Sequence, residues 1–278
     1  MPFLLGRTAV GSVGVAHLGV LALLAAASTR PALCRVEATG VGLSQAAQAT
    51  AWLSEVNDRL RARGLIPGWR DERYAVVDPA AAAGAPALAV IERAAARFWG
   101  TLTAGAHANG YVADASGRPT HLWIARRALS KATDPGKLDN LVGGGVPLGQ
   151  SPFETLVREG WEEAGLAAAR FAAAQPGRVL RLHRDVPEGL QAERLHVFDL
   201  ALPAGVQPVN QDGEVAEFHC LPVDEALARA RAGEMTVDAA LVTLDFALRR
   251  RLLPPHEHDG VAQAFARLCT EPDGVQPV

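Results

Sequence analysis

The chain is poor in cysteine and has no excess of basic charge, and each shortage excludes a class of protein. Its three cysteines lie far apart among 278 residues, which excludes a disulfide framework or a zinc site of closely spaced thiols. A reducing compartment is the simple interpretation, and we expect a cytoplasmic protein. Lysine and arginine number 27 against 30 acidic residues, so the sequence gives no electrostatic reason to expect nucleic-acid binding.

One apolar run, Ala9 to Ala27, allows two interpretations. It has the composition of a signal peptide or a marginal membrane span. Against export, Arg7 alone supplies the charge before it, and glycine recurs within it. We therefore favour a folded segment and expect no membrane partner. In that interpretation a hairpin of Phe3–Leu5 with residues 9–13 leads into a buried helix over residues 16–27.

The rest of the N-terminal third predicts a small α/β domain, residues 1–104. Apolar residues recur at helical spacing from Ala46 to Arg63, with Trp52 expected in the core. Further predicted elements are strands at 34–38, 42–43 and 74–77, and a helix at 88–98. Alternating strands and helices follow, and we assign residues 105–278 to a second domain.

The most informative stretch is residues 144–166, GGVPLGQSPFETLVREGWEEAGL. Ser151, followed three residues later by Glu154, makes a capping box, and Gly165 is suited to end the helix. The helix then carries Glu159, Glu162 and Glu163, and residues three or four apart share a helix face. Neighbouring carboxylates repel each other, and a hard divalent cation such as magnesium would explain their arrangement.

This stretch resembles the Nudix box. Gly144 opens the pattern, and the run from Arg158 to Leu166 closes it. Two positions depart from the family: Gln150 stands where a glutamate is usual, and Gly160 stands where an apolar residue is usual. The first departure removes an outer carboxylate. The resemblance implies a Nudix-type α/β/α sandwich with a mixed sheet, preceded by the small α/β domain.

Other stretches are similar to one branch, the Nudix proteins fused in fungi to thiamine pyrophosphokinase; they are residues 3–11, 64–72, 122–127, 131–140, 187–190 and 212–218. This resemblance implies magnesium-dependent hydrolysis of thiamine diphosphate, or of its oxidised analogues, to the monophosphate. The alternatives left open are hydrolysis of ADP-ribose, a dinucleotide or coenzyme A, and a non-catalytic ligand-binding domain. The partner is a small-molecule diphosphate, and a homodimer is left open.

The site residues expected from the resemblance fall into three groups. Glu159, Glu162 and Glu163 are expected to bind magnesium, or manganese in its place. Glu162, Glu163 and Arg158 are the expected catalytic residues, with Arg158 fixing a carboxylate. The general base is left open between two of these glutamates and two more distant ones, Glu214 and Glu217.

Substrate contacts are expected from the glycine turn and from nearby basic residues. Gly143, Gly144 and Gly145 would allow a tight backbone turn near the phosphates. Arg126 and Lys131 would contact the diphosphate, although ordinary solvated basic residues fit the sequence equally well. Trp123 and Trp161 are expected to fill the core.

Overall fold

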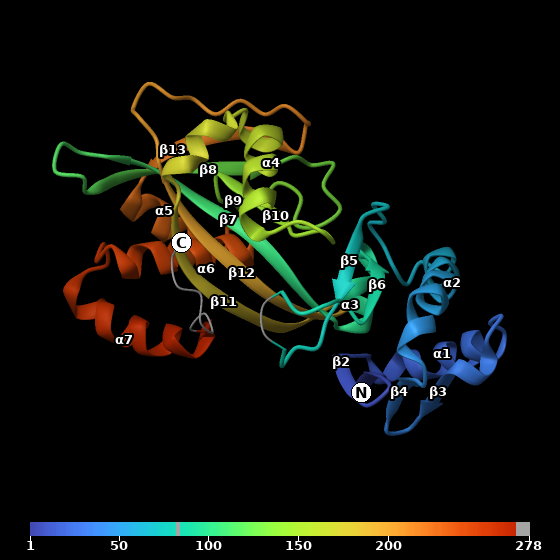
Figure 1. Ribbon diagram of the computed structural model, residues 1–278. Coiled ribbons are helices and arrows are strands. Elements are labelled where there is room, and N and C mark those ends of the chain that lie inside the picture. Colours follow the sequence, from blue (N-terminus) through green and yellow to red (C-terminus); the bar gives the residue numbers. More distant parts are fainter. Residues whose placement is uncertain (82–83, 271–278) are drawn as a thin grey trace. The chain divides into compact units, whose positions relative to one another are not determined.

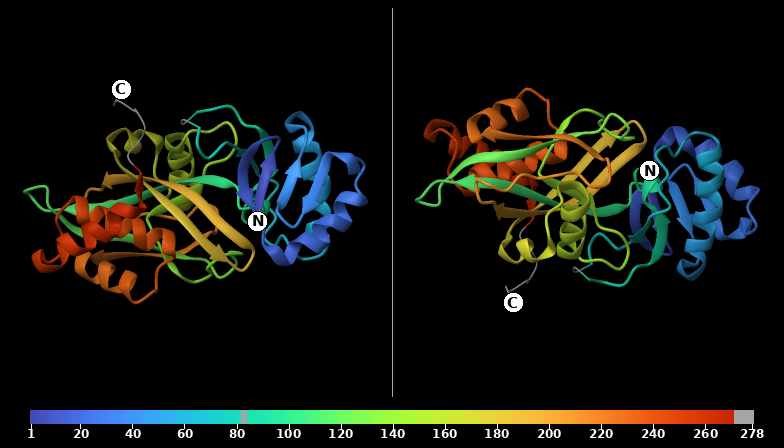
Figure 2. Two further views of the ribbon diagram at one scale, coloured as in Figure 1. Left: turned by 90° about the horizontal axis from the view of Figure 1, so that it is seen from below. Right: turned by 90° about the horizontal axis from the view of Figure 1, so that it is seen from above.

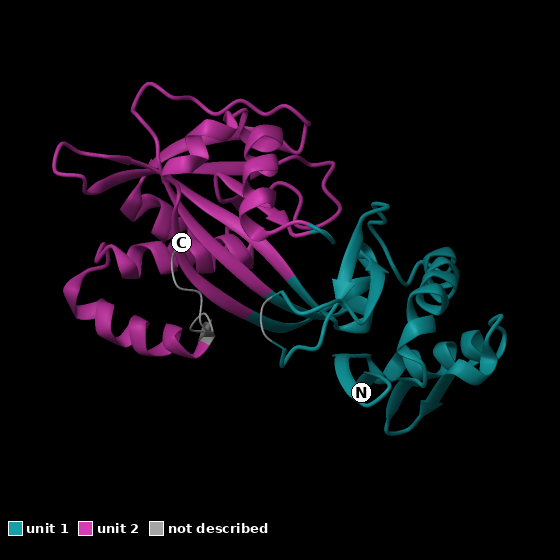
Figure 3. Ribbon diagram, in the orientation of Figure 1, with its two compact units in different colours: residues 1–103, 147–149, 182–193 teal, residues 104–146, 150–181, 194–278 magenta. Residues whose placement is uncertain are grey.

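The computed structural model describes residues 1–81 and 84–270, which form two compact units (Figure 1, Figure 3). The first unit comprises residues 1–103, 147–149 and 182–193. The second comprises residues 104–146, 150–181 and 194–278. The predicted division at 104/105 is contiguous, whereas the structure groups two short later segments with the first unit.

The first unit contains a four-stranded sheet in the order β2-β1-β4-β3. Its strands are β1 (Pro2–Leu5), β2 (Thr8–Ser12), β3 (Cys34–Glu37) and β4 (Gly40–Leu43). β1 and β4 run parallel while the other pairs are antiparallel, so this sheet is mixed. The apolar run forms β2 and α1 (Leu18–Ala26), as the folded interpretation predicts. No helix in the described parts of the chain combines the length and the apolar character that crossing a membrane requires.

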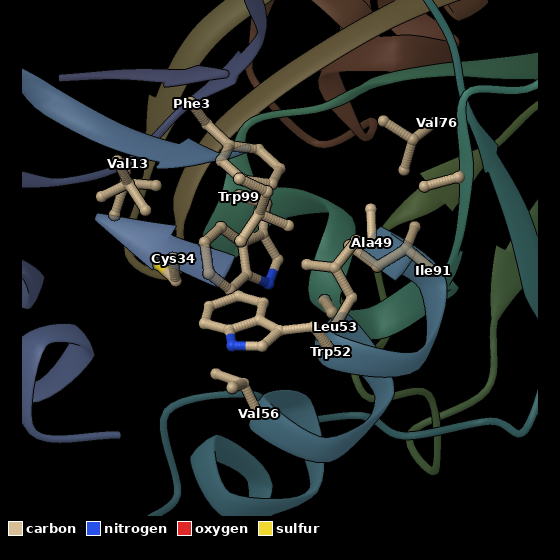
Figure 4. Packing of buried hydrophobic residues seen from close by; sticks show 14 of the residues in the cluster. Phe3, Val13, Cys34, Ala49, Trp52, Leu53, Val56, Val76, Ile91 and Trp99 are labelled. Carbon is tan, nitrogen blue, oxygen red and sulfur yellow. The ribbon is translucent and has the colours of Figure 1, made fainter. Parts of the chain in front are cut away.

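Aromatic side chains fill the core of the first unit (Figure 4). Trp52 on α2 (Ala49–Ala62) and Trp99 on α3 (Ala96–Trp99) are fully buried, and their ring centroids lie 5.9 Å apart. Phe3 packs against Trp99 with centroids 4.6 Å apart. The Trp99 indole donates a 2.7 Å hydrogen bond to Asn57, which satisfies its polar atom inside the core. The core role predicted for Trp52 is confirmed.

The helix predicted over residues 88–98 is wrong in its first half. Residues Ala89–Glu92 form β6, which pairs antiparallel with β5 (Arg73–Val76), and the segment becomes helical only from Arg93, in the 3-10 turn Arg93–Ala95 and α3. Alanine-rich composition favoured the helix, but Ala89 and Ile91 alternate with more exposed neighbours. That period of two, together with the pairing partner, decides the conformation.

The second unit is built on an eight-stranded sheet with the path β13-β8-β7-β12-β11-β14; β10 also pairs with β7, and β9 with β8. The strands are β7 (Leu102–Ala113), β8 (Pro119–Arg127), β9 (Leu138–Asp139), β10 (Val142–Gly145), β11 (Gln175–Val186), β12 (Gly189–Ala201), β13 (Val215–Pro222) and β14 (Cys269–Thr270). The predicted strands at 111–113, 122–125, 194–202 and 215–221 are present, several of them longer than expected. The long strand β11 was not predicted.

Helices lie on both faces of this sheet (Figure 2). α4 (Pro152–Ala164) covers one face, where Ala106, Leu156 and Phe171 belong to one core. α5 (Val223–Arg231), α6 (Val237–Arg249) and α7 (Pro255–Phe265) cover the other face and share a second core with Leu122 and Ile124. Trp123, between these two residues of β8, packs against the core beneath α4, so successive residues of β8 point to opposite faces. This arrangement agrees with the predicted sandwich and places α4, with the short 3-10 helix Ala168–Ala173, over the face that carries the site.

Candidate active site

The helix α4 begins and ends as the sequence predicts. The Ser151 hydroxyl accepts a hydrogen bond from the Glu154 backbone N–H at 3.2 Å, and the Glu154 carboxylate accepts one from the Ser151 N–H at 2.7 Å. Gly165 follows the last turn with a left-handed φ of 64°, and its N–H donates to the carbonyl of Trp161. These local contacts fix where the glutamates fall along the helix.

Gly160, one of the two departures from the family pattern, is explained by packing. A Cβ at this position would lie 2.0 Å from Cζ of Phe171, which is fully buried. The ring of Phe171 therefore packs directly on the helix backbone. A larger side chain at position 160 would displace it, so the glycine serves the core beneath α4.

Two of the three helix carboxylates turn inward against β10. Glu159 and Glu163 are buried, whereas the side chain of Glu162 is 38% exposed. One carboxylate oxygen of Glu163 accepts a 2.9 Å hydrogen bond from the Gly143 N–H. The Glu159 carboxylate lies where a Cβ of Gly144 would be, only 2.3 Å from that position. The helix thus presents its acidic face to a strand without side chains.

The glycine run is therefore a strand and not the tight turn that was expected. Gly143, Gly144 and Gly145 belong to β10, which pairs antiparallel with β7, and none of the three has a positive φ. At Gly143 and Gly144 close approach favours glycine: His107 lies 2.8 Å from a Cβ at Gly143, and Glu159 occupies the space at Gly144. The predicted turn conformation was wrong, while the need for glycine has a physical cause.

Burial disfavours the ionised form of Glu163. Burial and the nearby charge of Glu159 raise the pKa of Glu163 to about 8. The hydrogen bond from Gly143 opposes this rise, the charge of Asp139 adds to it, and the charge of Lys131 lowers it. A carboxylic acid with such a pKa stays largely protonated at neutral pH. A bound cation would reverse that balance.

Arg158 holds the outer side of the cluster. Its guanidinium lies 2.8 Å from Glu159 and 2.6 Å from Glu162. Gln150, the other departure from the family pattern, accepts hydrogen bonds from Arg158 at 3.4 Å and from the Thr155 hydroxyl at 3.0 Å. The amide therefore supports Arg158, which orients the carboxylates. It lies behind the site and does not replace a carboxylate inside it.

The predicted substrate-binding cations have different surroundings. Lys131 forms an ion pair with Glu214, and its charge acts on Glu163. Arg126 instead lies 2.5 Å from Glu217 and donates to the Gly136 carbonyl at 3.0 Å. The charge of Lys131 thus acts on Glu163, and Glu214 is linked to the site through its ion pair with Lys131, whereas Arg126 and Glu217 are paired across β8 and β13.

One site residue was missed by the sequence analysis. Asp139 on β9 is buried, its charge acts on Glu163, and its carboxylate lies 2.8 Å from Arg127. The Asn140 N–H donates to the other carboxylate oxygen. The signal available in the sequence was an acidic residue within an apolar, strand-like segment directly before the glycine run.

The core role predicted for Trp161 is wrong, because this residue is 55% exposed.

The carboxylate oxygens at this site are ligands of the kind that magnesium prefers. Within residues 1–81 and 84–270, no group of three or more His, Cys, Asp or Glu side chains is placed to hold a metal ion by itself. Glu159 and Glu163 nevertheless offer two neighbouring buried carboxylates, and the pKa of Glu163 is raised to about 8. Magnesium commonly binds through one or two carboxylates and completes its shell with waters and substrate phosphates. Glu162, paired with Arg158, is the weakest of the three predicted ligands.

Comparison with known proteins agrees with this geometry. Residues 105–241 match the NUDIX domain family, and residues 1–103 match a family described as a domain of unknown function (DUF4743). Nudix hydrolase 24, chloroplastic, from Arabidopsis thaliana is 38% identical over 230 residues, which are 81% of this chain and 60% of that protein. Nudix hydrolase 20, chloroplastic, from the same plant is 38% identical over 221 residues, 79% of this chain and 57% of that protein.

The chain therefore spans less than two thirds of the length of these relatives. Among solved structures, a NUDIX hydrolase from Alicyclobacillus acidocaldarius has a TM-score of 0.40 and 14% identity, and the match covers 51% of this chain and 89% of that one. The box on α4 and β10 lies inside the matched region. Residues 105–241 are a Nudix domain, in a chain homologous to plant Nudix hydrolases.

Proposed function

We propose that this chain hydrolyses the phosphoric anhydride of a small organic diphosphate and releases the monophosphate. The observation that carries the proposal is the pair of buried carboxylates, Glu159 and Glu163, packed against Gly143 and Gly144, with the pKa of Glu163 raised to about 8 by burial and by the charge of Glu159. Such a pair is suited to a divalent cation that also binds phosphate oxygens. Magnesium, or manganese in its place, would neutralise charge on the phosphates and polarise the anhydride.

Residues of the chain have separate roles in the proposed reaction. Glu159 and Glu163 supply the oxygen ligands, and Arg158 keeps Glu159 and Glu162 oriented through its two ion pairs. Lys131, held by Glu214, supplies a positive charge beside the carboxylates for the phosphate oxygens. In the reaction, the oxygen of a water bonds to phosphorus, the bridging P–O bond breaks, and a side chain accepts the proton of the water.

The contacts of the candidate bases favour some over others. Glu217 is paired with Arg126, whose hydrogen bond lowers the pKa of that carboxyl and makes it a weaker base. Glu214, paired with Lys131, belongs to the environment of Glu163. Glu162 is more exposed and bound by Arg158. We place the proton acceptor among Glu162, Glu163 and Glu214.

The substrate we propose is thiamine diphosphate or an oxidised analogue of it. This proposal rests on the resemblance of several stretches to the branch fused to thiamine pyrophosphokinase, including residues 64–72 and 131–140. The broader alternative is a nucleoside diphosphate linked to another group. The low cysteine content and the described fold are compatible with a cytoplasmic protein, which we retain as a proposal.

The test is an assay of magnesium-dependent product release across thiamine diphosphate, its oxidised forms, ADP-ribose and NADH. The unsubstituted chain should release a monophosphate from at least one of them. Glu163→Gln should reduce turnover at least about a hundredfold while the protein stays folded. Glu225→Gln is a matched control, because Glu225 forms only a surface pair with Arg229 on α5.

Two outcomes would contradict the proposal. Near-native turnover in Glu163→Gln would remove this carboxylate from the reaction. Binding of a diphosphate without any release of product would instead indicate a non-catalytic ligand-binding domain. A preference for ADP-ribose or NADH over every thiamine compound would keep the chemistry and change the substrate.

A further inference from the structure

A segment between β12 and β13, residues 209–214, is attached to the last turn of the Nudix helix. The N–H of Val209 donates to the Ala164 carbonyl and the N–H of Gln211 to the Glu162 carbonyl, both at 2.9 Å. The side-chain amide of Asn210 donates to the Glu163 carbonyl at 3.4 Å. The last carbonyls of a helix have no partner within the helix, so this segment serves as an external cap.

The side chain of Asn210 also closes a turn within the segment. Its oxygen accepts a 2.5 Å hydrogen bond from the Gly213 N–H, and its nitrogen donates to the Asp212 carboxylate at 2.8 Å. That carboxylate oxygen of Asp212 accepts from the Glu214 N–H, also at 2.8 Å. A continuous set of hydrogen bonds thus runs from the backbone of Glu163 through Asn210 and Asp212 to the backbone of Glu214.

Glu214 connects this set of hydrogen bonds to the candidate active site. Its carbonyl accepts a 2.9 Å hydrogen bond from the Ala128 N–H, and its carboxylate pairs with Lys131, whose side chain is only 10% exposed. The charge of Lys131 acts on Glu163. Glu214 is therefore connected twice to the carboxylate helix, through Asn210 along the chain and through Lys131 across space.

Polar contacts, and little apolar burial, hold the segment in place. Val209, Gln211, Asp212 and Gly213 are all exposed, with Val209 at 59%. Asn210 is half-buried and makes three of the side-chain hydrogen bonds described above. Because no apolar core fixes this loop, loss of the Asn210 amide should free Glu214 while the rest of the domain remains folded.

We propose that Asn210 is a positioning residue that acts through Glu214, holding the Lys131–Glu214 pair in a fixed place beside the carboxylates of α4. This inference rests on the proposed hydrolase function. It predicts that Asn210 affects the chemical step more than the binding of substrate, because Asn210 holds Glu214, one of the proposed proton acceptors, while Lys131 keeps its charge in the variant.

The test is a double-mutant cycle of Asn210→Ala and Glu214→Gln, measured with thiamine diphosphate or with whichever assayed diphosphate the unsubstituted chain turns over faster. Asn210→Ala should lower kcat about tenfold to a hundredfold, as expected for a displaced catalytic group, and leave KM nearly unchanged. In the Glu214→Gln background the same substitution should have almost no further effect.

Gln211→Ala is the matched control on the same segment. It removes only the side-chain bond to the Val209 carbonyl and keeps the backbone bond to Glu162, so kcat should stay near that of the unsubstituted chain. Equal losses from Asn210→Ala in both backgrounds would overturn the inference. So would a change confined to KM, or an equal loss in Gln211→Ala.

Amide hydrogen exchange gives a readout that needs no substrate. In Asn210→Ala the amides of Gly213 and Glu214 should exchange faster, while those in the middle of α4 keep their protection. Unchanged exchange at both amides would show that Asn210 does not hold Glu214. A chain that hydrolyses none of the assayed diphosphates would instead contradict the proposed function, and the exchange result would separate the two failures.

Discussion

Each face of the large sheet buries a pair of acidic residues, and the two pairs differ in the positively charged side chains that surround them. On the face of α6, Asp199 and Asp245 are surrounded by arginines: Arg249 lies 2.6 Å from each of them, and Arg250 and Arg178 stand nearby. On the face of α4, Glu159 pairs with Arg158, whereas the carboxylate of Glu163 accepts a hydrogen bond from the backbone N–H of Gly143.

The consequences for ionisation differ accordingly. Burial acts to lower the pKa of the Arg249 guanidinium, but its hydrogen bonds and charge contacts with Asp199 and Asp245 raise it above its ordinary value. That cluster carries its own counter-charge and needs no ligand. Burial also raises the pKa of Asp245, but the charges of Arg249 and Arg178 and a hydrogen bond from Arg249 oppose that rise. Against the burial of Glu163 stand a backbone hydrogen bond and the charge of Lys131, and its carboxyl has a pKa of about 8. Buried acidity indicates a cation site only where the protein does not neutralise it.

The largest expected effect on stability concerns Asp199 and Asp245, which are paired with arginines. Asp199→Asn should reduce the free energy of unfolding by about 3 to 5 kcal/mol, because it removes one of the two carboxylates that pair with the largely buried Arg249 and leaves Arg250 without Asp199 as well. Chemical denaturation measures this loss. The turnover of the molecules that remain folded should be unchanged. Asp199→Asn with native stability would show that the arginines find other partners and would weaken the comparison.

The next effect is a dependence of stability on pH that comes from Glu163. The folded-state pKa of Glu163, about 8, lies above the ordinary value of 4.5. The metal-free protein is therefore most stable with respect to this group below pH 4.5, and it loses that stability as the pH rises toward 8. The loss is about 1.4 kcal/mol for each pKa unit that separates the two states.

Glu163→Gln removes the titrating group and should flatten that part of the stability curve. Thermal unfolding at a series of pH values, in the presence of a chelator, compares the two proteins directly. An identical slope in both would mean that some other group is responsible.

A smaller effect is expected at Gly160. A Cβ there meets Phe171, and overpacking typically costs about 1 to 3 kcal/mol, partly offset by the better helix propensity of alanine. Gly260→Ala in α7 is the matched control, because a Cβ there meets no atom within 4 Å and should stabilise the helix slightly. If Gly160→Ala behaves like Gly260→Ala, the packing of Phe171 is not tight.

The smallest effect is expected at Gln150. Gln150→Glu keeps an oxygen facing Arg158 and Thr155, so turnover should be preserved or rise by no more than a few fold. Steady-state kinetics at saturating magnesium measures it. A complete loss of activity would reveal a role of the amide group other than supporting Arg158.

Local signals in the sequence were sufficient for α4 and its acidic face. The capping box at Ser151 and the helix-ending Gly165 depend only on neighbouring residues, and both are confirmed. Gly143 to Gly145 were misjudged because their need for glycine arises from His107 and Glu159, which approach from other elements. Contacts between distant residues decide such positions, and one sequence does not contain them.

The same limit explains the other errors. Residues 89–92 have a helix-favouring composition, but pairing with β5 makes them a strand. Asp139 and Asn210 belong to no motif, since their roles follow from the fold, which brings the strand β9 and the segment 209–214 beside Glu163. Trp161 lies outside the core, and hydrophobic character alone did not indicate its exposed side of the helix.

The central claim is that the buried carboxylate of Glu163 binds a divalent cation, whose positive charge favours its ionised form. Calorimetric titration with magnesium at neutral pH, in two buffers of different ionisation enthalpy, tests it directly. We predict binding accompanied by proton release from Glu163, lost in Glu163→Gln and retained in Asp199→Asn. Absence of binding to the unsubstituted chain, or equal binding and proton release in Glu163→Gln, would contradict the claim.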